Sequence, residues 1–192
     1  MLITQRQSAA LLEQGGVARR QARDLLRAGF AGAAMRAGNV CLYDRDMVAD
    51  LVSWPKLSLP GLDRLCPDGV FVARRAPDLT ADRATQLASV SDGWQMSPWT
   101  RLWLRTTVED GGPLPFVATV AGFVALGADI TAVGITAVDI SGVGGTVPTT
   151  SFALAEPGGW FDGVRRRRVQ TGPGRAWVLR GPRGVRSADA RR

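Results

Sequence analysis

The sequence predicts an α+β protein made of a small helix-rich N-terminal domain and a β-rich second domain with short helices. Three observations predict this division. Residues 1–54 carry short apolar stripes at helical spacing, each bounded by a capping residue or a glycine. Residues 55–90 hold four prolines and separate this part from the rest. Residues 91–182 are rich in β-branched residues and hold five of the six tryptophans, which supplies aromatic area for a core.

The first predicted helix begins after Thr4. Thr4 and Gln7 have the spacing of a capping box, in which two side chains bond each other's backbone amides. An apolar strip on about two turns of helix follows, formed by Ala9, Ala10 and Leu12. Residues 13–16 end this helix, and a second helix runs from Val17 to Gly29, a glycine suited to the position after a helix C-cap.

The second helix carries four arginines on one side. At about 100° per residue, the four fall within an arc of roughly 100°; they are Arg19, Arg20, Arg23 and Arg27. A separate arc holds the apolar residues Ala18, Ala22, Leu25 and Leu26. One face can therefore be buried, while the other presents cations spaced to meet phosphates or guanine edges.

A hairpin and a third helix complete residues 1–54. Residues 34–37 and 40–43 flank Gly38-Asn39, a pair that fits a two-residue hairpin turn. Asp44 is placed to cap the next helix, which Pro55 stops. The apolar face of that helix is formed by Met47, Val48, Leu51 and Val52. The order helix, turn, helix, hairpin, helix is the pattern of a winged helix-turn-helix.

Short motifs follow one another in a fixed order within this domain. They are Gln7-Ser-Ala-Ala10, Gly16-Val17-Ala18, Arg23, Gly29, the Gly38-Asn39 turn and Tyr43-Asp-Arg-Asp-Met-Val48. Together they resemble the MerR/excisionase type of winged helix-turn-helix. The resemblance implies a DNA-binding transcriptional regulator or excisionase-like factor. Ala18 stands where a serine cap is usual, and no long heptad helix for dimerisation follows Val52, which favours the excisionase-like branch.

Residues 55–90 are expected to form a proline-containing connector with some structure of its own. The prolines are Pro55, Pro60, Pro67 and Pro77. Val70–Ala73 is a predicted strand, and a predicted helix runs from Ala81 to about Val90 with Thr80 as its cap.

The second domain, residues 91–182, is predicted to contain one helix and several strands. Ser97-Pro98 begins the helix and places Trp99, Leu102 and Trp103 on one face. The predicted strands are residues 116–124, one or two within 130–140, and 149–155, followed by a hairpin of 164–170 and 175–180 around the turn 171–174. Residues 183–192 are expected to be a disordered basic tail.

The positive charge of the chain is concentrated near its C-terminal end. The formal net charge is +7, and residues 151–192 hold ten arginines against three acids. Such a basic segment favours a polyanionic partner or a solvated tail. The chain contains 23 arginines and one lysine, Lys56, a ratio typical of a GC-rich bacterial coding bias.

Double-stranded DNA is the predicted partner. Arg19, Arg20 and Arg23 are expected to enter the major groove, and Arg27 to contact phosphate. Arg36 beside the wing turn is placed for phosphate or the minor groove, and Arg6 for the DNA backbone. The run Arg165, Arg166, Arg167 and Arg168 alternates across both faces of a strand, so it is either a second nucleic-acid contact or a solvated edge.

Several other chemistries lack the residues that they need. The chain has no histidine and two cysteines, Cys41 and Cys66, so a tetrahedral zinc site and a histidine general base are excluded. Both cysteines are expected to be reduced, although a disulfide between them stays open. The carboxylate pairs Asp44/Asp46 and Glu109/Asp110 fit a helix cap and a turn. We therefore expect no catalytic residues, no metal and no cofactor.

A membrane association is not expected either. Residues 114–138 are largely apolar, but they contain three glycines, many β-branched residues and Asp129. A carboxylate at the bilayer centre costs about 2.5–3.5 kcal/mol, so buried strands are the better interpretation. The first residues also lack the pattern of a signal peptide. The sequence therefore predicts a cytoplasmic, nucleoid-associated protein.

Two other functions remain open. The β-rich domain could carry the function as a protein-interaction or structural component, with self-association through this domain. Alternatively, the tryptophans could line a site for an apolar ligand that regulates DNA binding. Tryptophans as base-stacking platforms are a third interpretation, but such residues more often fill a core.

Overall fold

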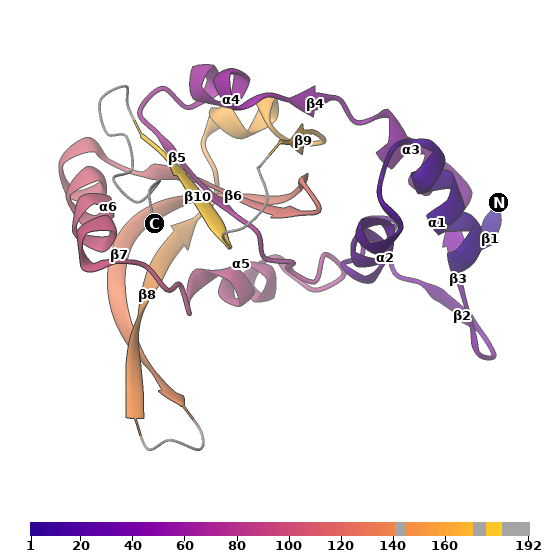
Figure 1. The fold of residues 1–192 in the computed structure, drawn as a ribbon, viewed down its shortest axis with the longest axis horizontal. Helices are drawn as coiled ribbons and strands as arrows, with labels where there is room; N and C mark the ends of the chain where they lie inside the picture. Colours follow the sequence, from indigo (N-terminus) through magenta and orange to yellow (C-terminus); the bar gives the residue numbers. More distant parts are fainter. Residues whose placement is uncertain (141–144, 171–175, 182–192) are drawn as a thin grey trace.

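The computed structural model describes residues 1–140, 145–170 and 176–181. It confirms a mixed α+β protein with a multi-stranded sheet. A small helical unit at the N-terminus lies beside a larger unit built around a seven-stranded sheet (Figure 1). The predicted turn 171–174 and the tail 183–192 lie outside the described residues.

The N-terminal unit has the predicted order of helices and hairpin. Its elements are β1 (Leu2–Thr4), α1 (Gln5–Gln14), α2 (Arg19–Arg27), β2 (Met35–Ala37), β3 (Val40–Asp44) and α3 (Arg45–Ser53). β2 and β3 form the predicted hairpin, and β1 adds a third antiparallel strand on the other side of β3. This first strand was not predicted, because three residues are too few to show an alternation of apolar and polar side chains.

The predicted helix ends of this unit are confirmed. The Thr4 hydroxyl accepts from the Gln7 amide in a complete capping box, and the Asp44 carboxylate accepts from the amides of Asp46 and Met47. Gly29 follows the end of α2 with a φ of 87°, a left-handed conformation that favours glycine. The predicted strip on α1 was wrong in one member, since Ala10 is exposed and Ser8 is buried instead.

The second unit begins earlier in the chain than residue 91. Its elements are β4 (Lys56–Leu57), α4 (Leu59–Leu65), β5 (Val70–Ala73), α5 (Arg83–Ser91), α6 (Pro98–Gly111), β6 (Leu114–Val120), β7 (Phe123–Ile140), β8 (Gly145–Ala155), the 3-10 helix η1 (Gly159–Gly163), β9 (Arg168–Val169) and β10 (Trp177–Arg180). The strand order is β10-β5-β6-β7-β9-β4, with β8 paired to β7. The predicted strand β5 lies inside this sheet, parallel to β6.

Helices cover both faces of the sheet. Phe71 and Ala73 of β5 point to the face covered by α5 and α6, where they pack with Trp94 and Leu104. Val70 and Val72 point to the opposite face and pack with Leu62 of α4. Because both faces are buried, β5 is apolar at every position, as expected for a central strand.

Three predictions about the second unit were wrong. The apolar run 116–124 is two strands, since Ala121 and Gly122 form a turn with φ of 53° and 85°. β9 and β10 do not form a hairpin: β9 pairs with β4 and β7, and β10 pairs with β5. The cap of α5 is Asp82, whose carboxylate accepts from the Thr85 amide, rather than Thr80.

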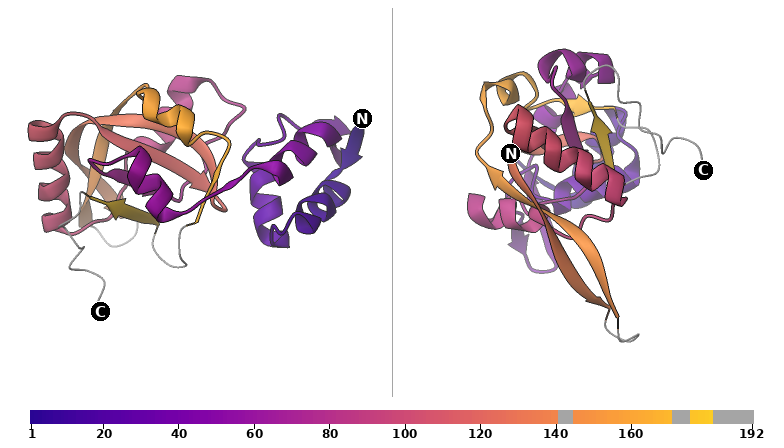
Figure 2. Two further views of the ribbon diagram at one scale, coloured as in Figure 1. Left: turned by 90° about the horizontal axis from the view of Figure 1, so that it is seen from above. Right: turned by 90° about the vertical axis from the view of Figure 1, so that its left-hand side faces the viewer.

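The predicted apolar face of α6 was wrong in two of its three members, since only Trp103 packs against the core of the sheet. Trp99 is 79% exposed and Leu102 47% exposed, whereas Leu104 and Val108 pack on the sheet. β7 and β8 continue beyond the body of the unit as a two-stranded ribbon (Figures 1 and 2). No helix within the described residues is long and apolar enough to cross a membrane.

The two units share one apolar core at their junction. Val120 and Phe123, at the β6–β7 turn, join the core of the N-terminal unit. The Phe123 ring contacts Phe30 at 6.0 Å and Trp54 at 5.8 Å between centroids. The Leu79 amide also donates to the carbonyl of Ala28 at the end of α2, 3.0 Å away. The N-terminal unit is therefore attached by packing as well as by the chain.

Candidate nucleic-acid interface

Helix α2 buries one face and exposes the other, as predicted, except that Ala18 of the predicted apolar face is the exposed N-cap. Ala22, Leu25 and Leu26 are at most 2% exposed and pack in the core of the N-terminal unit. The four arginines of the opposite face are all exposed: Arg19, Arg20, Arg23 and Arg27. The helix therefore presents a row of guanidinium groups on a rigid support.

These guanidinium groups are weakly held within the chain. Arg19 lies 3.8 Å from Glu13 and Arg27 lies 3.7 Å from Asp24, both as solvent-exposed pairs. Such pairs contribute about 0–1 kcal/mol, so they yield readily to a phosphate. Arg20 and Arg23 form no ion pair with the part of the chain that the structure describes.

The other predicted contacts of this unit are also exposed. Arg36 lies on β2, next to the turn of the hairpin that projects from the unit (Figure 1). Arg6 lies in the first turn of α1. Both side chains are open to solvent, but the structure does not bring either into contact with the arginines of α2.

The four arginines of residues 165–168 do not form one continuous surface. Arg165 is exposed and lies 3.5 Å from Asp162, while Arg166 pairs with Asp50 of α3 in the N-terminal unit. Arg167 is half-buried. Only Arg168 belongs to a strand, so alternation across a strand does not describe the run.

Arg168 connects the two units. Its guanidinium donates to the carbonyls of Gly15, Leu51 and Val52, at 3.4, 3.1 and 2.6 Å. It also lies over the Phe123 ring, with the guanidinium carbon 4.6 Å from the ring centroid. Its Nε atom is buried without a partner, and burial lowers the pKa of this arginine. The sequence offered no signal that separates Arg168 from its three neighbours.

The cysteines carry free thiols. Cys41 is half-buried, and Cys66 is buried at the C-terminal end of α4. Burial, together with the negative charges of Asp129 and Asp63, raises the pKa of Cys66 from 9.0 to about 12. A thiol in this state is a poor nucleophile. No cluster of acidic residues and cysteines suited to a metal ion occurs in the described part of the chain.

Comparisons with protein-family models, with curated proteins and with solved structures found no match. The resemblance of residues 1–54 to the MerR/excisionase type therefore stays a prediction from the motifs.

Proposed function

We propose that the N-terminal unit is a winged helix-turn-helix that binds double-stranded DNA, with α2 in the major groove. The observation that carries this proposal is the exposed row of arginines on α2, two of which have no ion pair in the described chain. Arginine presents a planar fork that binds phosphates and guanine edges bidentately. The role is transcriptional regulation or architectural binding of the excisionase kind.

Each arginine has a different expected contact. Arg19, Arg20 and Arg23 lie in the N-terminal half of α2, which is the half that contacts base edges in helix-turn-helix proteins. Arg27 lies one turn further and meets phosphate, while Arg36 of the hairpin and Arg6 of α1 contact the flanking backbone. Of the run 165–168, Arg165 and Arg167 remain candidates for a second phosphate contact.

Fluorescence anisotropy with a random 20-base-pair duplex tests the proposal. The double variant R20Q/R23Q removes two exposed charges that have no ion pair in the described chain. We expect it to weaken duplex binding at least tenfold, because charge-assisted contacts contribute about 1.5–3 kcal/mol each. The control R64Q/R105Q also removes two positive charges, from exposed sites on α4 and α6. Its dissociation constant for the duplex should stay within about twofold of the wild-type value. Equal losses in both variants would refute the role of α2.

A protein-interaction role is the second candidate, favoured by one observation. Trp99 and Leu102 form an exposed apolar face on α6, and exposed tryptophan is typical of interaction sites. Sedimentation velocity of the wild-type chain and of W99S/L102S tests this candidate. Self-association that the double variant abolishes would support this candidate. A wild-type chain that stays monomeric at concentrations up to about 100 µM would rule out self-association.

A further inference from the structure

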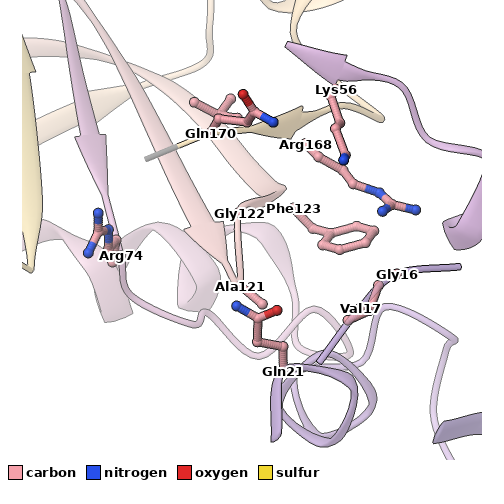
Figure 3. Close-up of a pocket in the computed structure, with 11 residues that line it drawn as sticks. Gly16, Val17, Gln21, Lys56, Arg74, Ala121, Gly122, Phe123, Arg168 and Gln170 are labelled. Carbon is pink, nitrogen blue, oxygen red and sulfur yellow. The ribbon is translucent and has the colours of Figure 1, made fainter. Parts of the chain in front are cut away.

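A cleft of about 640 Å³ lies between the two units. Gly16, Val17 and Gln21 line it from the N-terminal unit. The second unit contributes Lys56, Arg74, Arg168 and Gln170, together with the β6–β7 turn. Figure 3 shows the amide of Gln21 and the ammonium group of Lys56 directed toward the cleft from opposite sides. A ligand in this cleft would contact both units at once.

The lining of the cleft is cationic. Lys56, Arg74 and Arg168 line it, and none of its described lining residues is acidic. Arg168 donates only to neutral carbonyls and forms no ion pair with the described chain. A partly buried charge without a counter-charge is costly, and an anion nearby reduces that cost. The electrostatics of the cleft therefore favour a negatively charged occupant.

Lys56 contributes a mobile charge to this cleft. It is the single lysine in a chain with 23 arginines, it is exposed, and it forms no ion pair within the described residues. A lysine ammonium is a compact charge on a flexible stem, which can follow a small anion into place. The amides of Gln21 and Gln170 can supply further hydrogen bonds to the same anion.

We propose that this cleft binds a small molecule carrying a phosphate group. A dianionic phosphate matches the cationic lining, with Lys56 as its main ionic contact, and accepts hydrogen bonds from the amides. The volume lies within the usual range for small-molecule sites, about 300–1,000 Å³. Gln21 projects about 160° around the helix from Arg23. A duplex bound to the arginine face of α2 would therefore lie away from the cleft, so the proposed ligand is a different molecule. This site goes beyond the proposed function and does not depend on it.

Amine labelling of the DNA-free protein tests the site. The α-amine of Met1 and the side chain of Lys56 are the two amines of the chain, so mass spectrometry separates them easily. Sodium pyrophosphate is the probe, with sodium chloride at the same ionic strength as the reference. We expect pyrophosphate to slow the acetylation of Lys56 by a factor of about five or more. The acetylation rate of the Met1 amine should stay within about 1.5-fold of its rate in sodium chloride.

A thermal shift gives an independent readout of the same site. Saturating pyrophosphate should raise the melting temperature by about 5 °C. K56Q should lose most of this shift, whereas R105Q, which removes an exposed charge on α6, should keep it.

Three results would overturn the assignment. The first is Lys56 labelling that pyrophosphate slows no more than chloride does, and the second is equal slowing at Met1 and Lys56. The third is protection of Lys56 by a 12-base-pair duplex, which would place DNA in the cleft instead. A protein that binds no duplex but shows pyrophosphate protection would refute the proposed function alone.

Discussion

The guanidinium carbon of Arg168 lies 4.6 Å from the centroid of the Phe123 ring. This contact joins the two units, since the same guanidinium donates to three carbonyls of residues 15, 51 and 52 in the N-terminal unit. Phe123 in turn packs against Phe30 and Trp54. These contacts hold the N-terminal unit, which carries α2, against the second unit.

Replacing Arg168 should destabilise the protein more than replacing any exposed arginine. R168M keeps the aliphatic stem but removes the cation–π contact and the Arg168 donor from three carbonyls. Within the described residues, only the Leu51 carbonyl among them keeps another donor, the Trp54 amide. We expect a loss of about 2–4 kcal/mol in the free energy of unfolding, measured by urea denaturation. R165M, at an exposed site, should cost less than about 0.5 kcal/mol. Equal, small losses in the free energy of unfolding of the two variants would contradict the role of Arg168 in joining the two units.

Completing the cap of α2 should stabilise the N-terminal unit. Ala18 has the extended conformation of an N-cap, with φ −62° and ψ 145°, and its amide donates to the Gln21 side chain at 3.4 Å. A serine there can accept from the Gln21 amide, so A18S should gain about 1 kcal/mol in urea denaturation. T4A should lose a similar amount, because Thr4 already forms this bond on α1. A neutral or destabilising A18S would contradict the cap geometry.

Stability should fall in alkaline solution because of Cys66. Its pKa is raised by burial from 9.0 to about 12, so the folded chain keeps a proton that the unfolded chain loses between these values. Stability is therefore full below about pH 9 and declines toward pH 12. Burial also raises the pKa of Tyr43, which adds to the decline.

Urea denaturation at several pH values above 8 measures this effect. C66A should show a shallower decline with pH than the wild-type chain, whatever its absolute stability. An identical dependence on pH in the two proteins would contradict the assignment. C41A, at the half-buried thiol, serves as the control.

Local signals in the sequence predicted helix ends and the first hairpin well. The side chains of Thr4 and Asp44 act within three residues, so their effect is visible in a short window. The turn at Ala121-Gly122 was missed because apolar residues flank it on both sides and both strands are buried. The apolar spacing of Trp99 and Leu102 predicted a buried face, but α6 packs through Leu104 and Val108.

The roles of individual arginines depend on tertiary structure. Arg165 and Arg168 are chemically identical in the sequence, yet one is exposed and the other crosses to the N-terminal unit. Only the position of β9 beside β4 and β7 brings Arg168 over Phe123. The exposed arginines of α2 could be predicted, because helix periodicity alone separates them from Leu25 and Leu26.

The salt dependence of duplex binding tests the central claim most directly. Anisotropy titrations between about 50 and 200 mM sodium chloride, a range over which such binding changes steeply, give the slope of log Kobs against log salt. We predict a steep negative slope for the wild-type chain and a slope flatter by about 0.9 for R27Q, because Arg27 is the arginine of α2 that is assigned to a phosphate. R64Q/R105Q should keep the wild-type slope. A wild-type chain that binds no duplex in dilute buffer, or a slope that R27Q leaves unchanged, would contradict DNA binding through α2.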